Sequence, residues 1–161
     1  MSNAQHINFT DCIFIRNSAN SGGALHLNGK INGIRHSEFA NNTATISGGA
    51  VIANNALEIY SCEFVNNSVL NHTEFLIGGY GGGAIYSFDN LNVYRSSFKS
   101  NYANASGGAV YASKYLNAYN CEFMDNTAVY DGGAVYGDVW QMTRSNVGTL
   151  KFSEASFYDT L

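Results

Sequence analysis

Three glutamates stand at equivalent positions of a repeated pattern. Glu38, Glu63 and Glu122 each directly precede a Phe that begins a Phe-x-x-Asn motif. Paired carboxylates at a suitable separation could cleave a glycosidic bond, so these residues are the first candidates for catalysis. Adjacent side chains of a strand point to opposite faces, and the neighbouring Phe is apolar. We therefore expect the stacked carboxylates to form a solvated outward face rather than a catalytic pair.

A second acidic group lies near the C-terminus. Asp125, Asp131 and Asp138 are close together in sequence, and Arg144 follows them. Acids with a basic partner suit a polysaccharide lyase or hydrolase, whereas single Asp residues in loops commonly cap turns. Turn capping is the favoured interpretation. The chain is accordingly not predicted to be an enzyme and no catalytic residue is assigned, although a carbohydrate-active lyase or hydrolase is kept as an alternative.

Histidine, glycine and cysteine give no sign of a metal or cofactor site. Gly81-Gly82-Gly83 is not followed by the Asp that calcium-binding repeats require. Cys12, Cys62 and Cys121 fall two residues before a motif Phe on alternating turns, too far apart for a disulfide, so we expect small buried residues. The histidines that share no ligand spacing are His6, His26, His36 and His72. No metal and no cofactor are predicted.

The composition excludes several classes of protein. Hydrophobic residues make up 45% of the 161 residues and charged residues only 12%, which is typical of one folded domain. The net charge is -4 and the 8 basic residues are scattered, so neither nucleic acid nor a membrane is an expected partner. No secretion signal or apolar span is visible, and residues 1–6 are interpreted as an N-terminal extension or tag remnant.

Two motifs recur in one register, about every 25 residues. The first is Gly-Gly-Ala followed by a branched aliphatic residue, and the second is Phe-x-x-Asn. The glycine pairs are Gly22 and Gly23, Gly48 and Gly49, Gly82 and Gly83, Gly107 and Gly108, and Gly132 and Gly133. The second motif gives Phe14 and Asn17, Phe39 and Asn42, Phe64 and Asn67, Phe98 and Asn101, Phe123 and Asn126, and a degraded copy at Phe157 and Thr160.

This repeat predicts the fold. Apolar residues alternate in short runs with Gly and Asn between them and no Pro, which indicates strands rather than helices. One unit can bury its apolar residues only by stacking on the next. We therefore predict an all-β, right-handed, single-stranded parallel β-helix of about six turns over residues 7–161. A β-sandwich is the competing fold, but its hairpins would not require so long a register.

Stacking places equivalent residues in columns along the axis of the coil. The motif Phe residues and the aliphatic residue after Gly-Gly-Ala are predicted to lie inside. We expect Gly-Gly at a corner that needs a positive φ or a close backbone approach. The motif Asn is expected at another corner, where its amide bonds the amide of the next turn.

Two segments exceed the regular period and are interpreted as loop insertions, residues 70–81 and residues 138–147. Loops on a rigid scaffold commonly carry binding residues, so Trp140 is a predicted binding residue. The turn that ends at Phe39 fits only with one inserted residue, which places Ile31 and Ile34 inside. The domain is either complete or a fragment of a longer repeat protein.

Two columns of tyrosine are predicted to face outward and are candidate binding residues. Exposed rings could stack on sugar rings or on an apolar patch of a partner. The favoured interpretation is that they stack on one another and stabilise the sheet. The columns are Tyr86, Tyr111 and Tyr136, and Tyr60, Tyr94 and Tyr119. N-glycosylation sequons, several of which are expected by chance, begin at Asn8, Asn41, Asn66, Asn71 and Asn104.

The alternation of Gly-Gly-Ala-(Ile/Leu/Val) with Phe-x-x-Asn over residues 7–136 resembles the repeats of the chlamydial polymorphic outer membrane proteins and related adhesin-like β-helix proteins. The resemblance implies a β-helical surface passenger, often an adhesin, that an autotransporter barrel exports through an outer membrane. No barrel-like series of strands follows the repeats, so the resemblance implies either an excised passenger or another export route.

The predicted function is an extracellular or cell-surface structural and adhesive module. It would present loops and Tyr-lined faces to a glycan or protein on the surface of a host or neighbouring cell. One alternative is a subunit of an extracellular fibre, because open strand edges at both ends would let copies stack end to end. The other alternative is the carbohydrate-active enzyme named above.

Overall fold

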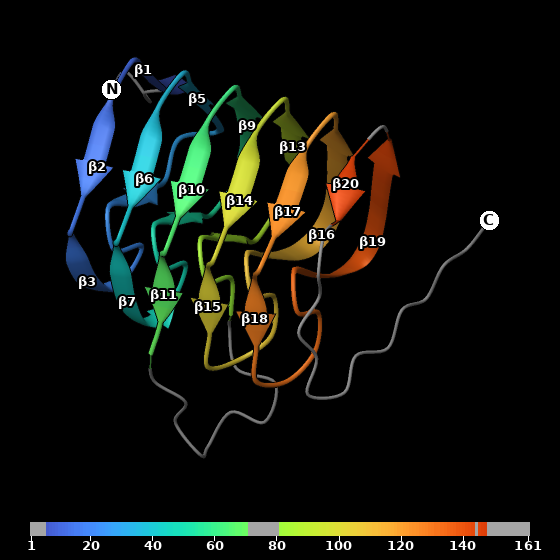
Figure 1. Ribbon diagram of the computed structural model, residues 1–161. Coiled ribbons are helices and arrows are strands. Elements are labelled where there is room, and N and C mark those ends of the chain that lie inside the picture. Colours follow the sequence, from blue (N-terminus) through green and yellow to red (C-terminus); the bar gives the residue numbers. More distant parts are fainter. Residues whose placement is uncertain (1–5, 71–80, 144, 148–161) are drawn as a thin grey trace.

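The chain forms a coil of parallel strands. The computed structural model describes residues 6–70, 81–143 and 145–147, and no helix occurs in them. The near strands in Figure 1 run downward, the far strands return upward, and the chain advances from left to right, which makes the coil right-handed. The five strands of its smallest sheet correspond to about five turns, close to the six predicted.

Three sheets run along the coil, and every strand pair in them is parallel. Sheet A contains β1 (His6–Thr10), β4 (Leu25–Leu27), β5 (Ile31–Arg35), β8 (Val51–Ala53), β9 (Ala56–Tyr60), β12 (Ile85–Ser87), β13 (Leu91–Tyr94), β16 (Val110–Tyr119) and β19 (Val135–Thr143). Sheet B contains β2 (Ile13–Ile15), β6 (Glu38–Ala40), β10 (Glu63–Val65), β14 (Ser97–Lys99), β17 (Glu122–Met124) and β20 (Asn146–Val147). Sheet C contains β3 (Ser18–Ser21), β7 (Thr43–Ser47), β11 (Ser68–Val69), β15 (Tyr102–Ala103) and β18 (Thr127–Ala128).

The phenylalanine column confirms the predicted register. Successive motif Phe residues are direct partners on neighbouring strands of sheet B. Their rings stack nearly parallel with centroids 4.7 to 4.8 Å apart, and the four inner rings are fully buried. Hairpins would have paired antiparallel strands, so the β-sandwich is excluded.

Each turn has three corners, and each corner contains a left-handed backbone position. One is the first glycine of Gly-Gly, with φ between 58° and 74° in all five copies. The second glycine is required for a different reason, because a Cβ on Gly23 would lie 2.6 Å from the carbonyl oxygen of Thr43. Both reasons anticipated for the glycine pair are confirmed. The other two corners use non-glycine residues, namely Asp11, His36, Ser61, Arg95 and Asn120, and Arg16, Asn41, Asn66, Ser100 and Asp125.

The motif asparagines form the predicted amide ladder. The side-chain amide of Asn42 donates to Oδ1 of Asn67 at 2.9 Å and to the carbonyl oxygen of Phe14 at 2.9 Å. Oδ1 of Asn42 accepts from both the backbone N–H and the side chain of Asn17. The same bonds recur from Asn67 through Asn126. Buried amides therefore join consecutive turns beside the Phe stack.

The turn that ends at Phe39 contains no inserted residue, contrary to the sequence prediction. Asn32, not Ile31, pairs with Ile7 and Leu57 in the core column, and Asn32 is fully buried while Ile31 is exposed. The Asn32 amide can lie inside because its Nδ2 donates to the carbonyl oxygens of Gly29 and Ala56 at 3.0 and 3.1 Å. The core position was assigned to the wrong residue because a polar side chain occupies it.

The second predicted loop, residues 138–147, is also wrong. These residues complete a turn, because β19 pairs with β16 through Thr143 and β20 pairs with β17. Trp140 lies in register with Leu116, so it belongs to a strand and not to an inserted loop. Trp and Met stand where other turns have aliphatic or small residues, which hid the repeat. The structure does not describe residues 71–80 of the first predicted loop, nor the degraded Phe-x-x-Asn copy at Phe157.

Candidate functional site

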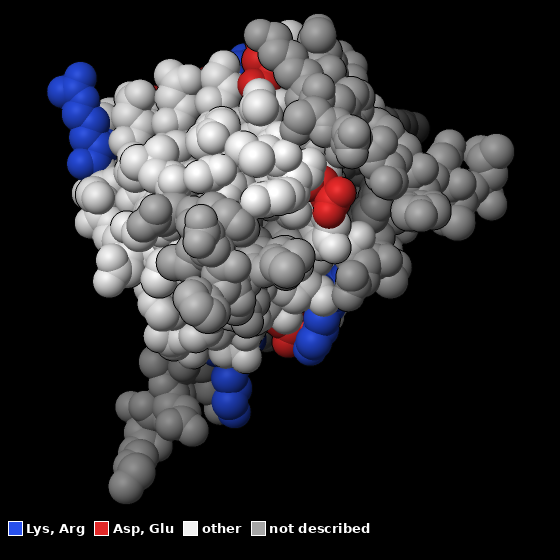
Figure 2. Space-filling model, turned by 90° about the horizontal axis from the view of Figure 1, so that it is seen from below, with Lys and Arg blue, Asp and Glu red and all other residues white. Residues whose placement is uncertain are grey.

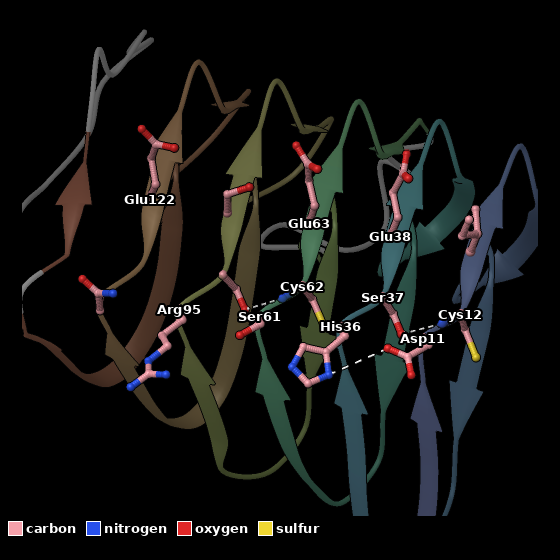
Figure 3. Close-up of a pocket in the computed structure, with 14 residues that line it drawn as sticks. Asp11, Cys12, His36, Ser37, Glu38, Ser61, Cys62, Glu63, Arg95 and Glu122 are labelled. Carbon is pink, nitrogen blue, oxygen red and sulfur yellow. Dashed lines mark hydrogen bonds and ion pairs between the residues drawn. The ribbon is translucent and has the colours of Figure 1, made fainter.

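A groove follows the corner between sheets A and B, and we call it the A/B groove. It has a volume of about 710 Å³ and crosses successive turns (Figure 3). Three consecutive positions of each turn line it. The first rim contains Asp11, His36, Ser61, Arg95 and Asn120, the floor Cys12, Ser37, Cys62 and Ser96, and the second rim Ile13, Glu38, Glu63, Ser97 and Glu122.

Backbone conformation creates the groove. Every residue of the first rim has a φ between 46° and 55°, which turns the chain at the end of a sheet A strand. The next residue points inward, so the floor side chains Ser37, Cys62 and Ser96 are buried. The residue after that points outward again at the start of a sheet B strand. Two outward columns separated by a column of small inward residues leave a channel along the axis.

Serine and cysteine alternate along the floor for a hydrogen-bonding reason. The backbone N–H of Cys12 donates to Oγ of Ser37 at 3.1 Å, and that of Cys62 donates to Oγ of Ser96 at 3.0 Å. Each serine hydroxyl donates in turn to the carbonyl two residues earlier. Cys121 continues the pattern by bonding Ser145, a floor residue that the sequence analysis missed because it misplaced the last turn.

The two rims differ in charge. Glu38 and Glu63 are partners on neighbouring strands, one turn apart, and they point outward from the second rim as expected (Figure 3). Glu122 lies farther along the same column, where Lys99 Nζ approaches its carboxylate at 3.6 Å. On the first rim His36 Nδ1 lies 3.9 Å from Asp11 Oδ1. Such exposed ion pairs contribute little stability, so these side chains remain free to exchange partners.

Charged side chains are sparse on the opposite side of the coil. Figure 2, seen from below, shows a mostly uncharged surface over the part that is described. The A/B groove carries carboxylates on the second rim and Arg95 on the first (Figure 3). The groove is therefore the place where polar recognition groups gather.

The other predicted acidic cluster does not form. Asp125 occupies the left-handed corner before β18, and Asp131 stands beyond the other end of that strand, next to the Gly-Gly corner. Asp138 is a residue of β19, and Arg144 lies outside the described residues. The described residues contain no group of three His, Cys, Asp or Glu side chains that could hold a metal ion.

The floor cysteines give a prediction about reactivity. All three thiols are free, Cys62 and Cys121 are buried, and Cys12 is partly exposed. Burial raises the pKa of Cys62 and Cys121, against the opposing effect of backbone hydrogen bonds. Iodoacetamide at neutral pH should label Cys12 at least about tenfold faster than the other two, which should become equally reactive in urea. Peptide mass mapping checks this, and fast labelling of Cys121 in the folded chain would contradict it.

The same thiols should make the fold sensitive to alkali. A buried thiol whose pKa is raised stabilises the folded state fully below the ordinary thiol pKa. That contribution is lost as the pH rises through the raised pKa, because ionisation then favours the unfolded chain. A C62S/C121S variant, whose hydroxyls do not ionise in this range, should lose less stability between neutral and alkaline pH than the parent chain.

The tyrosine columns are ladders of stacked rings. The rings of Tyr60 and Tyr94 stack at 4.5 Å, and those of Tyr86 and Tyr111 at 4.9 Å. The Arg35 guanidinium lies 5.1 Å above the Tyr60 ring. Ring faces are therefore covered by the rings of neighbouring turns. This arrangement agrees with the favoured self-stacking interpretation and weakens the idea of sugar rings stacking on these faces.

One tyrosine of the predicted binding columns is not accessible to a ligand. Tyr86 is only 1% exposed, so its assignment to an accessible binding face is wrong. Phe88 packs against it in a T-shaped arrangement, Tyr111 covers one ring face, and its hydroxyl shares a hydrogen bond with Ser113 at 2.9 Å. Tyr60, Tyr94, Tyr111, Tyr119 and Tyr136 are partly exposed.

The predicted sequons lie at the surface where they are described. Asn8, Asn41 and Asn66 are exposed and Asn104 is partly exposed, whereas Asn71 lies outside the described residues. Asn41 and Asn66 occupy left-handed corners. A glycan at either position would project from the corner between sheets B and C, away from the A/B groove.

The sequence did not indicate the first rim. Its five residues are of five different types, so no motif marks them. The one available signal was that each is polar and directly precedes the floor Cys or Ser. That signal would have identified the first rim as a column of equivalent polar residues. It would not have shown that the corner between sheets A and B forms a groove beside this column.

Comparison with known proteins identifies the repeat. The Chlamydia polymorphic membrane protein repeat matches residues 61–87, 95–113 and 120–138. Comparison with curated proteins and with solved structures gives no match. The described part of the chain has no helix that could span a membrane. The three matched segments each contain a strand of sheet B, a strand of sheet C and the beginning of a strand of sheet A, so these parts of the coil are similar to the Chlamydia polymorphic membrane protein repeat.

Proposed function

We propose that the chain is a cell-surface β-helical module that binds a neutral glycan strand along the A/B groove. The repeat and the β-helical fold fit a surface-associated module, which is the coarser part of the proposal. The observation that carries the finer part is the groove itself, an open channel parallel to the axis whose two rims repeat with every turn. A linear ligand would meet one residue of each rim at every turn, although the residue types differ from turn to turn.

The chemistry of the rims favours sugar hydroxyls. Ser61, Ser97 and Asn120 both donate and accept hydrogen bonds, Arg95 only donates, and Glu63 only accepts. Mixed donors and acceptors side by side match hydroxyl groups, which also do both. Carboxylates on the second rim would repel an anionic polysaccharide, so a neutral strand is the better partner.

A glycan array with the whole chain tests the proposal. S97Y should fill the groove and weaken the neutral-glycan signal by roughly tenfold or more. The matched control is S68Y, which places the same side chain at an outward strand position of sheet C, away from the groove. Equal binding by the parent chain and S97Y would overturn the assignment of the groove, and no glycan binding at all would overturn the proposed ligand.

Catalysis is the second candidate, because Glu38 and Glu63 stand on neighbouring strands as paired acids would. We propose binding without cleavage. A general acid needs an environment that keeps it protonated, and Glu63 is exposed while Glu38 is partly exposed. Incubation of the chain with neutral and acidic polysaccharides, followed by chromatography, should give no shortened products. Products that disappear in E63Q would reverse this conclusion.

A further inference from the structure

One column of tyrosines on sheet A is held in register by the strands that carry it. Tyr94 of β13 is the direct partner of Tyr60 of β9 on one side and of Tyr119 of β16 on the other. All three side chains are partly exposed. Parallel pairing therefore keeps phenol groups of consecutive turns next to one another at the surface of the coil.

Tyr60 and Tyr94 are in close contact. Their ring centroids are 4.5 Å apart and their planes differ by only 14°. Burial is the largest cause of the raised pKa of Tyr94, and Tyr60 adds to it through its charge and a hydrogen bond between the two side chains. The two hydroxyl groups consequently lie side by side, and so do the ring carbons next to them.

This arrangement suits one reaction of phenols. Removal of one electron and one proton from a tyrosine gives a phenoxyl radical, whose unpaired electron is shared with the two ring carbons beside the C–O bond. Two such radicals couple when these carbons meet. Reactants that are already held together in one molecule need no encounter in solution, so a neighbouring ring is strongly favoured over a distant one.

We propose that Tyr60 and Tyr94 form a site of oxidative cross-linking, at which a dityrosine bond joins two consecutive turns of the coil. The oxidant is hydrogen peroxide activated by an enzyme of the haem peroxidase class. One peroxide takes one electron and one proton from each tyrosine and is reduced to two molecules of water. A C–C bond forms between the rings, and the hydrogen on each bonded carbon then moves to the oxygen of its own ring, which restores both phenols.

The surroundings of the pair direct the coupling. Arg35 is the strand partner of Tyr60 on the side opposite Tyr94, and its guanidinium carbon lies 5.1 Å from the centre of the Tyr60 ring. Tyr94 is therefore the one phenol next to Tyr60 within the described part of this column. The bond would close a loop over residues 60–94 and restrict the unfolded chain, which stabilises the coil. The inference goes beyond glycan binding and does not depend on it.

Peroxidase treatment of the whole, dilute chain tests the proposal. The parent should gain dityrosine fluorescence in the band of the single chain on a denaturing gel. Peptide mapping should find residues 60 and 94 joined, with two hydrogen atoms lost. Y94F keeps an aromatic ring in the stack but removes the phenol that Tyr60 and Tyr119 share as a neighbour. Dityrosine formation within the chain should therefore fall by about half or more.

The matched control is Y102F, which removes one phenol from sheet C. Tyr102 is more exposed than Tyr94, but its partners on the neighbouring strands are Ser68 and Thr127 and not tyrosines. If exposure alone decided which tyrosines couple, Y102F would lose at least as much dityrosine as Y94F. If register decides, as proposed, Y102F should give the same yield as the parent.

Three results would overturn the proposal. These are the absence of dityrosine in the treated parent, dityrosine that occurs only in covalent dimers and larger species, and an equal loss in Y94F and Y102F. Circular dichroism checks that Y94F is folded. If it is not, the parent is treated with a photochemical one-electron oxidant with and without urea. Unfolding separates the rings, so the yield of the peptide joining residues 60 and 94 should then fall at least about tenfold, and equal yields would contradict the proposal.

Discussion

A G108A substitution is expected to destabilise the fold by about 3 kcal/mol or more. The new Cβ would overlap the carbonyl oxygen of Gly133 in the next turn and lie 2.7 Å from the backbone of Thr127. All of these are backbone atoms. They cannot move aside without separating two turns, because the N–H of Gly108 also donates to the carbonyl of Gly132.

Chemical denaturation monitored by circular dichroism measures the effect. The matched control is G33A, which adds the same methyl group within β5. There the Cβ would meet Oδ1 of Asn8 at 2.5 Å, the end of an exposed side chain that can rotate away. The expected change for G33A is below about 1 kcal/mol, since a strand favours Ala over Gly. Similar losses in both variants would show that the Gly-Gly corner is not as tightly packed as described.

An N67A substitution is expected to cost about 3 to 5 kcal/mol. Asn67 is fully buried, and its amide contacts both neighbouring turns. Its removal leaves the backbone N–H and side chain of Asn42 without their acceptor and the carbonyl of Phe39 without its second donor. Each buried polar group left without a partner costs about 1 to 3 kcal/mol, so the losses accumulate.

The same substitution at the end of the ladder supplies the comparison. N17A removes an exposed asparagine that only donates within the described residues, so water can replace its contacts. Its expected cost is about 1 kcal/mol. Urea denaturation of both variants gives the difference directly. Equal costs would mean that the ladder contributes through each asparagine alone and not through bonds between turns.

These two substitutions concern the features that the sequence determined. In a solenoid, residues that touch across turns are equivalent in sequence, so the repeat of Phe-x-x-Asn and Gly-Gly-Ala encodes its own tertiary contacts. This is why the stack from Phe14 to Phe123, the asparagine ladder and the positive φ of the first glycine could all be predicted. Prediction failed where a turn departed from the pattern, at Asn32 and at Trp140.

The tertiary structure alone decided how the surface is shaped. The A/B groove depends on a left-handed backbone at residues as different as His36, Ser61 and Arg95, and no residue type there signals that conformation. The covering of Tyr86 likewise depends on Phe88 and on Ser113 of the next turn, at a position whose residue type is not repeated. A periodic sequence fixes contacts along the axis, because equivalent residues meet there. Contacts between columns are set by the angles of the corners, so they emerge only when the coil is complete.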